Sequence, residues 1–98
     1  DFTPYVGEGV AENLESALKQ LEQADEALVK SCTEICQIAH KSGGLDELEA
    51  DDASLALAII RKASMELDQP ISYPKLKRSL REHDEKLYWV TKNLNKAF

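Results

Sequence analysis

The chain has 98 residues, of which 43% are apolar and 31% are charged, a composition typical of one soluble globular domain and not of a disordered segment. No apolar run approaches the ~18 residues of a membrane span, and the start lacks the apolar core of a signal peptide. The two cysteines, Cys32 and Cys36, lie one helical turn apart, which disfavours a disulfide between them and excludes an internal disulfide framework. We therefore expect an intracellular protein, cytoplasmic or nuclear.

The net charge of −6 is spread unevenly. Residues 1–68 carry 5 basic and 15 acidic side chains, a net charge of −10, whereas residues 69–98 carry 7 and 3, a net charge of +4. Such asymmetry indicates either that a basic helix packs beside acidic ones or that the charges form a polar interaction surface.

The first nine residues contain one proline and two glycines, which oppose helix formation. We expect residues 1–9 to form an extended N-terminal arm. Its aromatic residues Phe2 and Tyr5 either pack onto the rest of the domain or remain available to a partner.

A first helix is predicted over residues 10–41. Apolar and small residues recur in steps of four and three from Leu14 to Ala39, which places them on one stripe of a helix. Ser42 and the two glycines after it supply the left-handed stop that helix C-termini favour. A continuous helix of this length would extend over roughly 45–50 Å.

Two further helices follow. Asp46, with a glutamate three residues later, resembles a capping box and predicts a helix over residues 46–68, which ends before Pro70. Pro74 suits the first turn of a third helix over residues 74–97, with Ser72 or Tyr73 as its cap.

One stripe keeps its phase through the third helix, so a single continuous helix is the simplest interpretation. The stripe consists of Leu76, Leu80, His83, Leu87, Val90 and Leu94. The short connections make consecutive helices antiparallel. The predicted architecture is all-α: an up-down-up three-helix bundle over residues 10–98, with a long first helix.

Two polar residues interrupt the apolar stripes. Asp25 lies mid-way along the first helix and His83 in the third, and pairing the helices about their turns sets them about one turn apart. Lys62 falls at the edge of the same region. These side chains either form a buried polar layer that fixes helix register or reach solvent separately.

The chemistry-bearing residues do not assemble into a recognisable active or metal site. Cys32, Cys36 and His40 are spaced at one-turn intervals but lack a fourth zinc ligand. The acidic cluster at 46–52 lacks the residue order of a calcium loop. Ser79 lies one turn from His83, but a packed bundle offers it no substrate cleft. We expect no enzyme activity, no cofactor and no small-molecule substrate.

Trp89 is the most informative residue for function. At 100° per residue it lies about 200° from Leu87, on the side of the helix opposite the apolar stripe. Tyr88 flanks it, and its neighbours on that outer face are Arg78, Glu82, Glu85, Lys92 and Lys96. The indole either forms a docking site for a partner or is covered by the N-terminal arm or the first helix.

These patterns favour a non-enzymatic adaptor or regulatory domain that binds a protein partner, or itself, through the outer face of the third helix. The alternative is a helix-turn-helix-like nucleic-acid-binding domain that uses the basic C-terminal third, with a chain break at His83–Asp84. The absence of a turn glycine, the continuous stripe and the acidic net charge weigh against this alternative.

Overall fold

The structure is a computed structural model, and it describes residues 2–22, 24–43, 45, 48, 50–80 and 87–97. All regular elements of this part of the chain are helices. They are α1 (Thr3–Val6), α2 (Glu8–Gln20), α3 (Glu26–Ser42), α4 (Asp52–Glu66), α5 (Tyr73–Ser79) and α6 (Leu87–Ala97). The all-α class is therefore confirmed, whereas six helices in the described residues stand in place of the three that the sequence predicts.

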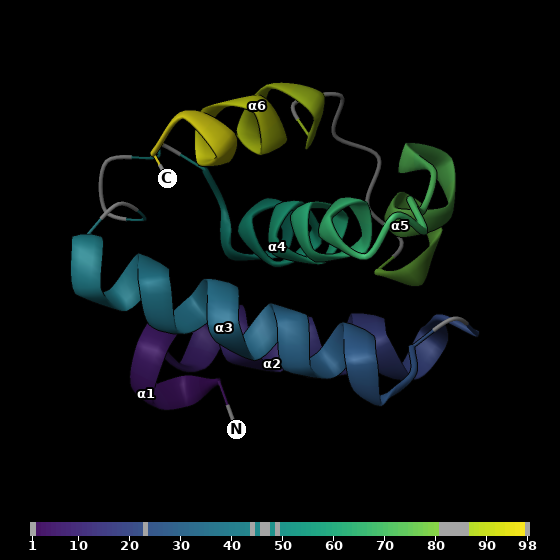
Figure 1. Ribbon diagram of the computed structural model, residues 1–98, viewed down its shortest axis with the longest axis horizontal. Helices are drawn as coiled ribbons and strands as arrows, with labels where there is room; N and C mark the ends of the chain where they lie inside the picture. Colours follow the sequence, from purple (N-terminus) through teal and green to yellow (C-terminus); the bar gives the residue numbers. More distant parts are fainter. Residues whose placement is uncertain are drawn as a thin grey trace.

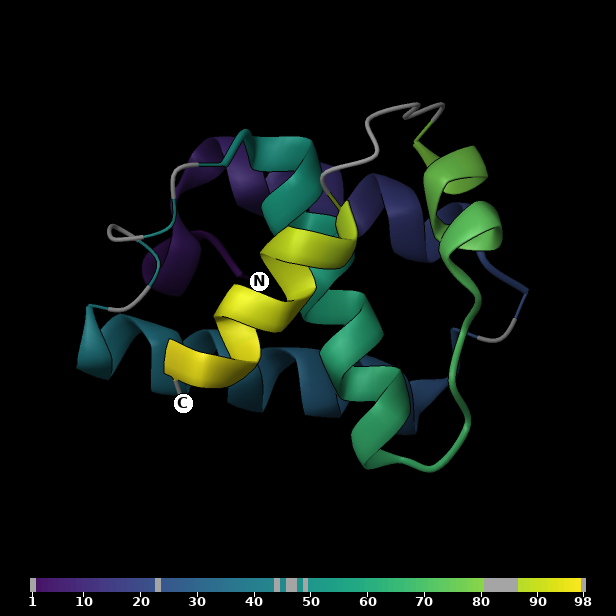
Figure 2. The same cartoon turned by 90° about the horizontal axis from the view of Figure 1, so that it is seen from above.

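Helix α4 lies at the centre of the molecule (Figure 1). Helices α2 and α3 pack against one side of α4, and α6 packs against the opposite side. Figure 2 shows α6 crossing over α4, with α5 beside them. The short α1 covers α2 and α3 on the side away from α6.

The sequence of α4 explains its central position. Every residue from Ser54 to Ile60 is buried, and Ala63 and Ser64 continue the buried surface. Leu57 and Ala58 within this run are fully buried, so the buried surface is not confined to one stripe. A helix that is apolar on all sides has to be enclosed by other helices. The uninterrupted apolar run of α4 therefore favours a central helix over one with a solvent-exposed side.

The expected first helix is wrong as a continuous element, because it breaks between α2 and α3. Leu21 has extended backbone angles, and Asp25, also extended, accepts a hydrogen bond from the backbone N–H of Leu28 at 2.9 Å. Aspartate stabilises a helix start in this way, so the chain begins a new helix there. Folding back lets Leu14 of α2 and Ile35 of α3 both pack into one core, which a projecting helix would not permit.

The expected extended arm is also wrong. Pro4 lies in the first turn of α1, where its missing N–H costs nothing, and Gly7 joins α1 to α2. Gly7 has φ +86° and ψ 166°, a combination that is essentially restricted to glycine. The turn at Gly7 folds the N-terminal segment against the domain, and Phe2 is only 5% exposed.

The connection from α3 to α4 agrees in part with the sequence. Gly43 ends α3 with φ +67°, the predicted left-handed stop. The proposed capping box of Asp46 and Glu49 lies outside the described residues. Helix α4 begins at Asp52, later than expected, with Asp51 at its N-cap position.

The third predicted helix is likewise two helices. Ser72 caps α5 through a hydrogen bond from the N–H of Lys75, and Pro74 lies in its first turn, as expected. Helix α5 ends at Ser79, and α6 begins at Leu87. The stripe residues Leu76 and Leu87 are nevertheless both buried, because each of these two helices packs against α4.

These breaks give the molecule nearly equal dimensions of 30 × 28 × 25 Å. A 45–50 Å first helix would not fit within such a body. Most described apolar residues of the predicted stripes are buried, whereas Asp25 is exposed and Leu80 is half-buried, and the chain turns back on itself more often than the stripes indicate.

Candidate interaction surface

The outer face of α6 carries two large exposed aromatic side chains. Trp89 is 60% exposed and Tyr88 is 50% exposed, whereas Leu87, Val90 and Leu94 of the same helix are buried. The phase of α6 explains this, because the residues that contact α4 recur on the opposite side of the helix. The prediction that the indole points away from the core is confirmed.

Tyr88 and Trp89 belong to a row of aromatic rings contributed by two helices. The ring centroids of Tyr73, in α5, and Tyr88 are 6.0 Å apart, and those of Tyr88 and Trp89 are 5.4 Å apart. Both pairs are edge-to-face, with interplanar angles of 69° and 78°. This arrangement brings the positive edge of one ring to the negative face of the next. We call Tyr73, Tyr88 and Trp89 the aromatic row.

A cation lies over the ring at each end of the aromatic row. The guanidinium carbon of Arg61, in α4, is 4.6 Å from the centroid of the Tyr73 ring. The ammonium nitrogen of Lys92, in α6, is 5.6 Å from the Trp89 ring. Cations at these distances are attracted to the negative ring faces. The aromatic row and its two cations therefore connect α4, α5 and α6, with positive charge at both ends of the row.

The Arg61 end of the row is held firmly. A guanidinium N–H of Arg61 donates a hydrogen bond to the carbonyl of Ile71, and the backbone N–H of Ile71 donates to the hydroxyl of Ser64 at 3.2 Å. Ile71 itself is buried. These contacts fix the segment between α4 and α5, so Tyr73 is a rigid base against which Tyr88 rests.

Lys62 connects α4 to α6. Its ammonium group donates a hydrogen bond to the side-chain carbonyl of Asn95 at 3.1 Å and lies 3.6 Å from the carboxylate of Glu66. Lys62 is therefore a half-buried link between two helices. Further along α6, Lys96 is exposed on the same outer side as Lys92.

The structure corrects the proposed buried polar layer of Asp25, His83 and Lys62. Asp25 is exposed and caps α3, because the chain breaks there instead of continuing as a helix. His83 lies outside the described residues. Asp25 therefore belongs to no buried layer, and Lys62 has the different role described above.

Three of the residues predicted to contact a partner lie away from Trp89. Phe2 is buried in the core, because α1 folds onto α2 and α3. Tyr5 is half-buried, and its hydroxyl accepts a hydrogen bond from the Gln37 side chain of α3 at 3.3 Å. Arg78 borders a hollow of about 310 Å³ with Ser16 and Gln20 of α2, since α5 and α6 are separate helices and do not share one face.

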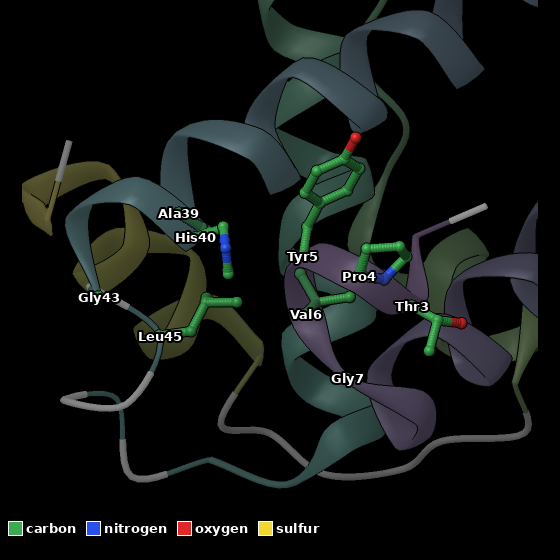
Figure 3. A pocket seen from close by; sticks show the side chains of 9 residues that line it. All are labelled: Thr3, Pro4, Tyr5, Val6, Gly7, Ala39, His40, Gly43 and Leu45. Carbon is green, nitrogen blue, oxygen red and sulfur yellow. The ribbon is translucent and has the colours of Figure 1, made fainter.

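A second hollow, of about 390 Å³, lies between α1 and the C-terminal end of α3. Figure 3 shows the Tyr5, His40 and Leu45 side chains around it. The rings of Tyr5 and His40 meet edge to face with centroids 6.1 Å apart. This contact packs α1 against α3, and among the residues that line the hollow no serine or cysteine accompanies His40.

The thiols of Cys32 and Cys36 are buried in the core and reduced. The pKa of both thiols is raised to about 12, mainly by burial and, for Cys32, also by the neighbouring Cys36. Thiols with such pKa values are protonated at neutral pH and are poor nucleophiles and metal ligands. In the described part of the chain, no three His, Cys, Asp or Glu side chains are grouped so that they could hold a metal ion.

Sequence reasoning missed the contributions of Arg61 and Tyr73 to this surface. The sequence indicates only a helix cap for Tyr73, and no pattern in it singles out Arg61. The positions of Arg61 and Tyr73 relative to Tyr88 depend on the path of the segment around Ile71 across α4. The spacing of residues along the sequence does not specify this path.

None of the described helices combines the length and the apolar character that crossing a bilayer requires. Comparison with known proteins found no matching family model, no matching curated protein and no matching solved structure.

Proposed function

We propose that this chain is a non-enzymatic protein-interaction domain that docks a partner on the outer face of α6. The observation that carries the proposal is the 60% exposure of Trp89 at the end of the aromatic row. Tryptophan, tyrosine and arginine are the residue types most enriched at the energetic centres of protein interfaces. We define the contact surface as Tyr88, Trp89, Lys92 and Lys96.

The contacts that hold the aromatic side chains of this surface in place favour binding of a partner. The ring of Tyr88 touches Tyr73 on one side and Trp89 on the other, and the Tyr73 ring lies beneath Arg61. Side chains held in this way lose less conformational freedom when a partner binds, which increases the net gain from burying them.

The charges of the surface indicate the chemistry of the partner. Arg61 lies over the Tyr73 ring and Lys92 over the Trp89 ring, so a cationic ligand would be repelled by like charge at both ends of the row. Lys92 and Lys96 lie one turn apart on the exposed side of α6. An acidic partner surface with an apolar centre fits this arrangement.

The experiment places a photo-cross-linking amino acid at position 89 of the full chain, in the cells that produce it. We expect a protein adduct that is degraded by protease, resists nuclease and is lost in Lys92→Glu. The matched control carries the same cross-linker at Lys30, an exposed position of α3. Equal adduct yields at positions 89 and 30 would contradict the proposal.

A nucleic-acid-binding domain is the second candidate. The observation in its favour is that α5 and α6 are separate helices, with α6 beginning close to the break that a helix-turn-helix requires. The acidic net charge of −6 opposes binding to a phosphate backbone. A nuclease-sensitive adduct at position 89, with salt-sensitive retention on a DNA duplex column, would favour this candidate.

A further inference from the structure

We propose that the acidic partner of the contact surface is a second copy of this chain, which presents the outer side of its α2. This inference rests on the proposed function and specifies its partner. The recognised element is a row of three carboxylates, Glu8, Glu12 and Glu15, which we call the acidic stripe. All three side chains are exposed.

The acidic stripe and the contact surface have matching spacings. Glu8 and Glu15 are seven residues apart on α2, as are Trp89 and Lys96 on α6, which corresponds to about 10 Å along each helix. Lys92 and Lys96 are separated by one turn, as are Glu8 and Glu12. Two helices laid side by side can therefore pair these charges over a common length.

The acidic stripe has one basic neighbour on its own helix, Lys19, one turn beyond Glu15. No ion pair joins Glu8, Glu12 or Glu15 to a described cation. The charges of the whole chain follow the same division, with −10 over residues 1–68 and +4 over residues 69–98. Opposite charges on two surfaces of one chain attract different copies to each other.

The positions of the two surfaces determine the kind of assembly. Helix α2 lies on one side of α4 and α6 lies on the other (Figure 1). When the contact surface of one copy binds the acidic stripe of a second, each copy retains one unused surface. Such a contact is head-to-tail, so it generates a growing chain or a ring instead of a closed two-fold dimer.

The test measures the mass of the purified full chain by sedimentation at low and high ionic strength. We expect a concentration-dependent mass above the 11.0 kDa of one copy at low salt, which falls toward 11.0 kDa as salt screens the charges. Lys92→Glu with Lys96→Glu should raise the dissociation constant at least about tenfold, and so should Glu12→Lys with Glu15→Lys.

The decisive step mixes these two double variants. Each variant retains one intact surface, and the two reversed surfaces carry opposite charges, so the mixture should associate although neither variant associates alone. Lys30→Glu with Lys41→Glu is the matched control, because it makes the same charge change at exposed positions of α3 and should leave association unchanged. Circular dichroism verifies that every variant is folded.

The outcomes separate this inference from the proposed function. Either of two results overturns the second copy as partner: a wild-type chain that stays at 11.0 kDa at low salt, or a mixture of variants that does not pair. If position 89 still cross-links to another protein in cells, the proposed function stands with a different partner. If position 89 gives no higher yield of protein adduct than the control position, both the proposed function and the second copy as partner are wrong.

Discussion

At the scale of single residues, the two cysteines yield a prediction about reactivity. Burial raises the pKa of the Cys32 and Cys36 thiols to about 12, compared with 9.0 for an exposed thiol. Because only the thiolate reacts, labelling of the folded protein at pH 8 should be slower than labelling of the urea-unfolded chain by about a thousandfold. Time-resolved mass spectrometry with iodoacetamide measures both rates, and similar rates would contradict the burial.

The same pKa shift predicts how stability depends on pH. The unfolded thiols ionise near pH 9, whereas the folded ones keep their protons until about pH 12. The folded state therefore binds more protons in this window, and its stability falls as the pH rises from 9 to 12. The variant Cys32→Ala/Cys36→Ala should lose this part of the pH dependence in urea unfolding, although it is less stable at every pH.

The glycines at the helix ends also act as single residues. Gly7 has backbone angles that only glycine adopts readily, whereas Gly43 has left-handed helical angles that asparagine also tolerates. No atom lies within 4 Å of a Cβ added at either position, so the cost of substitution comes from the backbone alone. We expect Gly7→Asn to destabilise by about 1–3 kcal/mol and Gly43→Asn by less than about 1 kcal/mol. Equal shifts of the urea midpoint would contradict this difference.

At the scale of helices, the break before α3 depends on one carboxylate. Asp25 accepts a hydrogen bond from the N–H of Leu28, whereas Asp51, at the same position before α4, makes no such bond with its side chain. Asp25→Ala should therefore cost about 1 kcal/mol in the free energy of unfolding, and Asp51→Ala clearly less. The pair is a matched control because both residues are exposed aspartates at a helix start. If Asp25→Ala has no effect, this cap does not stabilise the break.

The helices also show how far the sequence can be interpreted without a structure. Periodicity identified the faces that become buried, because Leu14, Ile35, Leu76 and Leu94 all lie in the core. It did not reveal where the chain turns, because a stripe can keep its phase on both sides of a break. Asp25 was the available signal, since aspartate mid-way along a helix stripe is also a good helix start.

At the scale of the whole molecule, the central position of α4 depends on contacts that are distant in sequence. The exposure of Trp89 followed from the phase of one helix and could be predicted. The aromatic row could not, because Arg61, Tyr73 and Tyr88 come together only when α5 and α6 have both folded back over α4. Surfaces built from one helix are accessible to sequence reasoning, and surfaces built from three are not.

The N-terminal segment gives a final test of this architecture. An arm that left Phe2 available to a partner would make this residue dispensable for stability, but Phe2 is 5% exposed and belongs to the core that α2, α3 and α4 share. Phe2→Ala should therefore lower the free energy of unfolding by about 3–5 kcal/mol, the cost of removing a buried aromatic ring. The unfolding of a domain with one core should remain a single transition, followed by circular dichroism in urea.

The matched control for Phe2 is Tyr88→Ala, which removes an aromatic ring that is 50% exposed. Its ring contacts Tyr73 and Trp89 only by their edges and faces at the surface, so we expect a loss of about 1 kcal/mol or less. If the two variants unfold at the same urea concentration, Phe2 is not part of the core and the N-terminal segment does not pack against the rest of the domain.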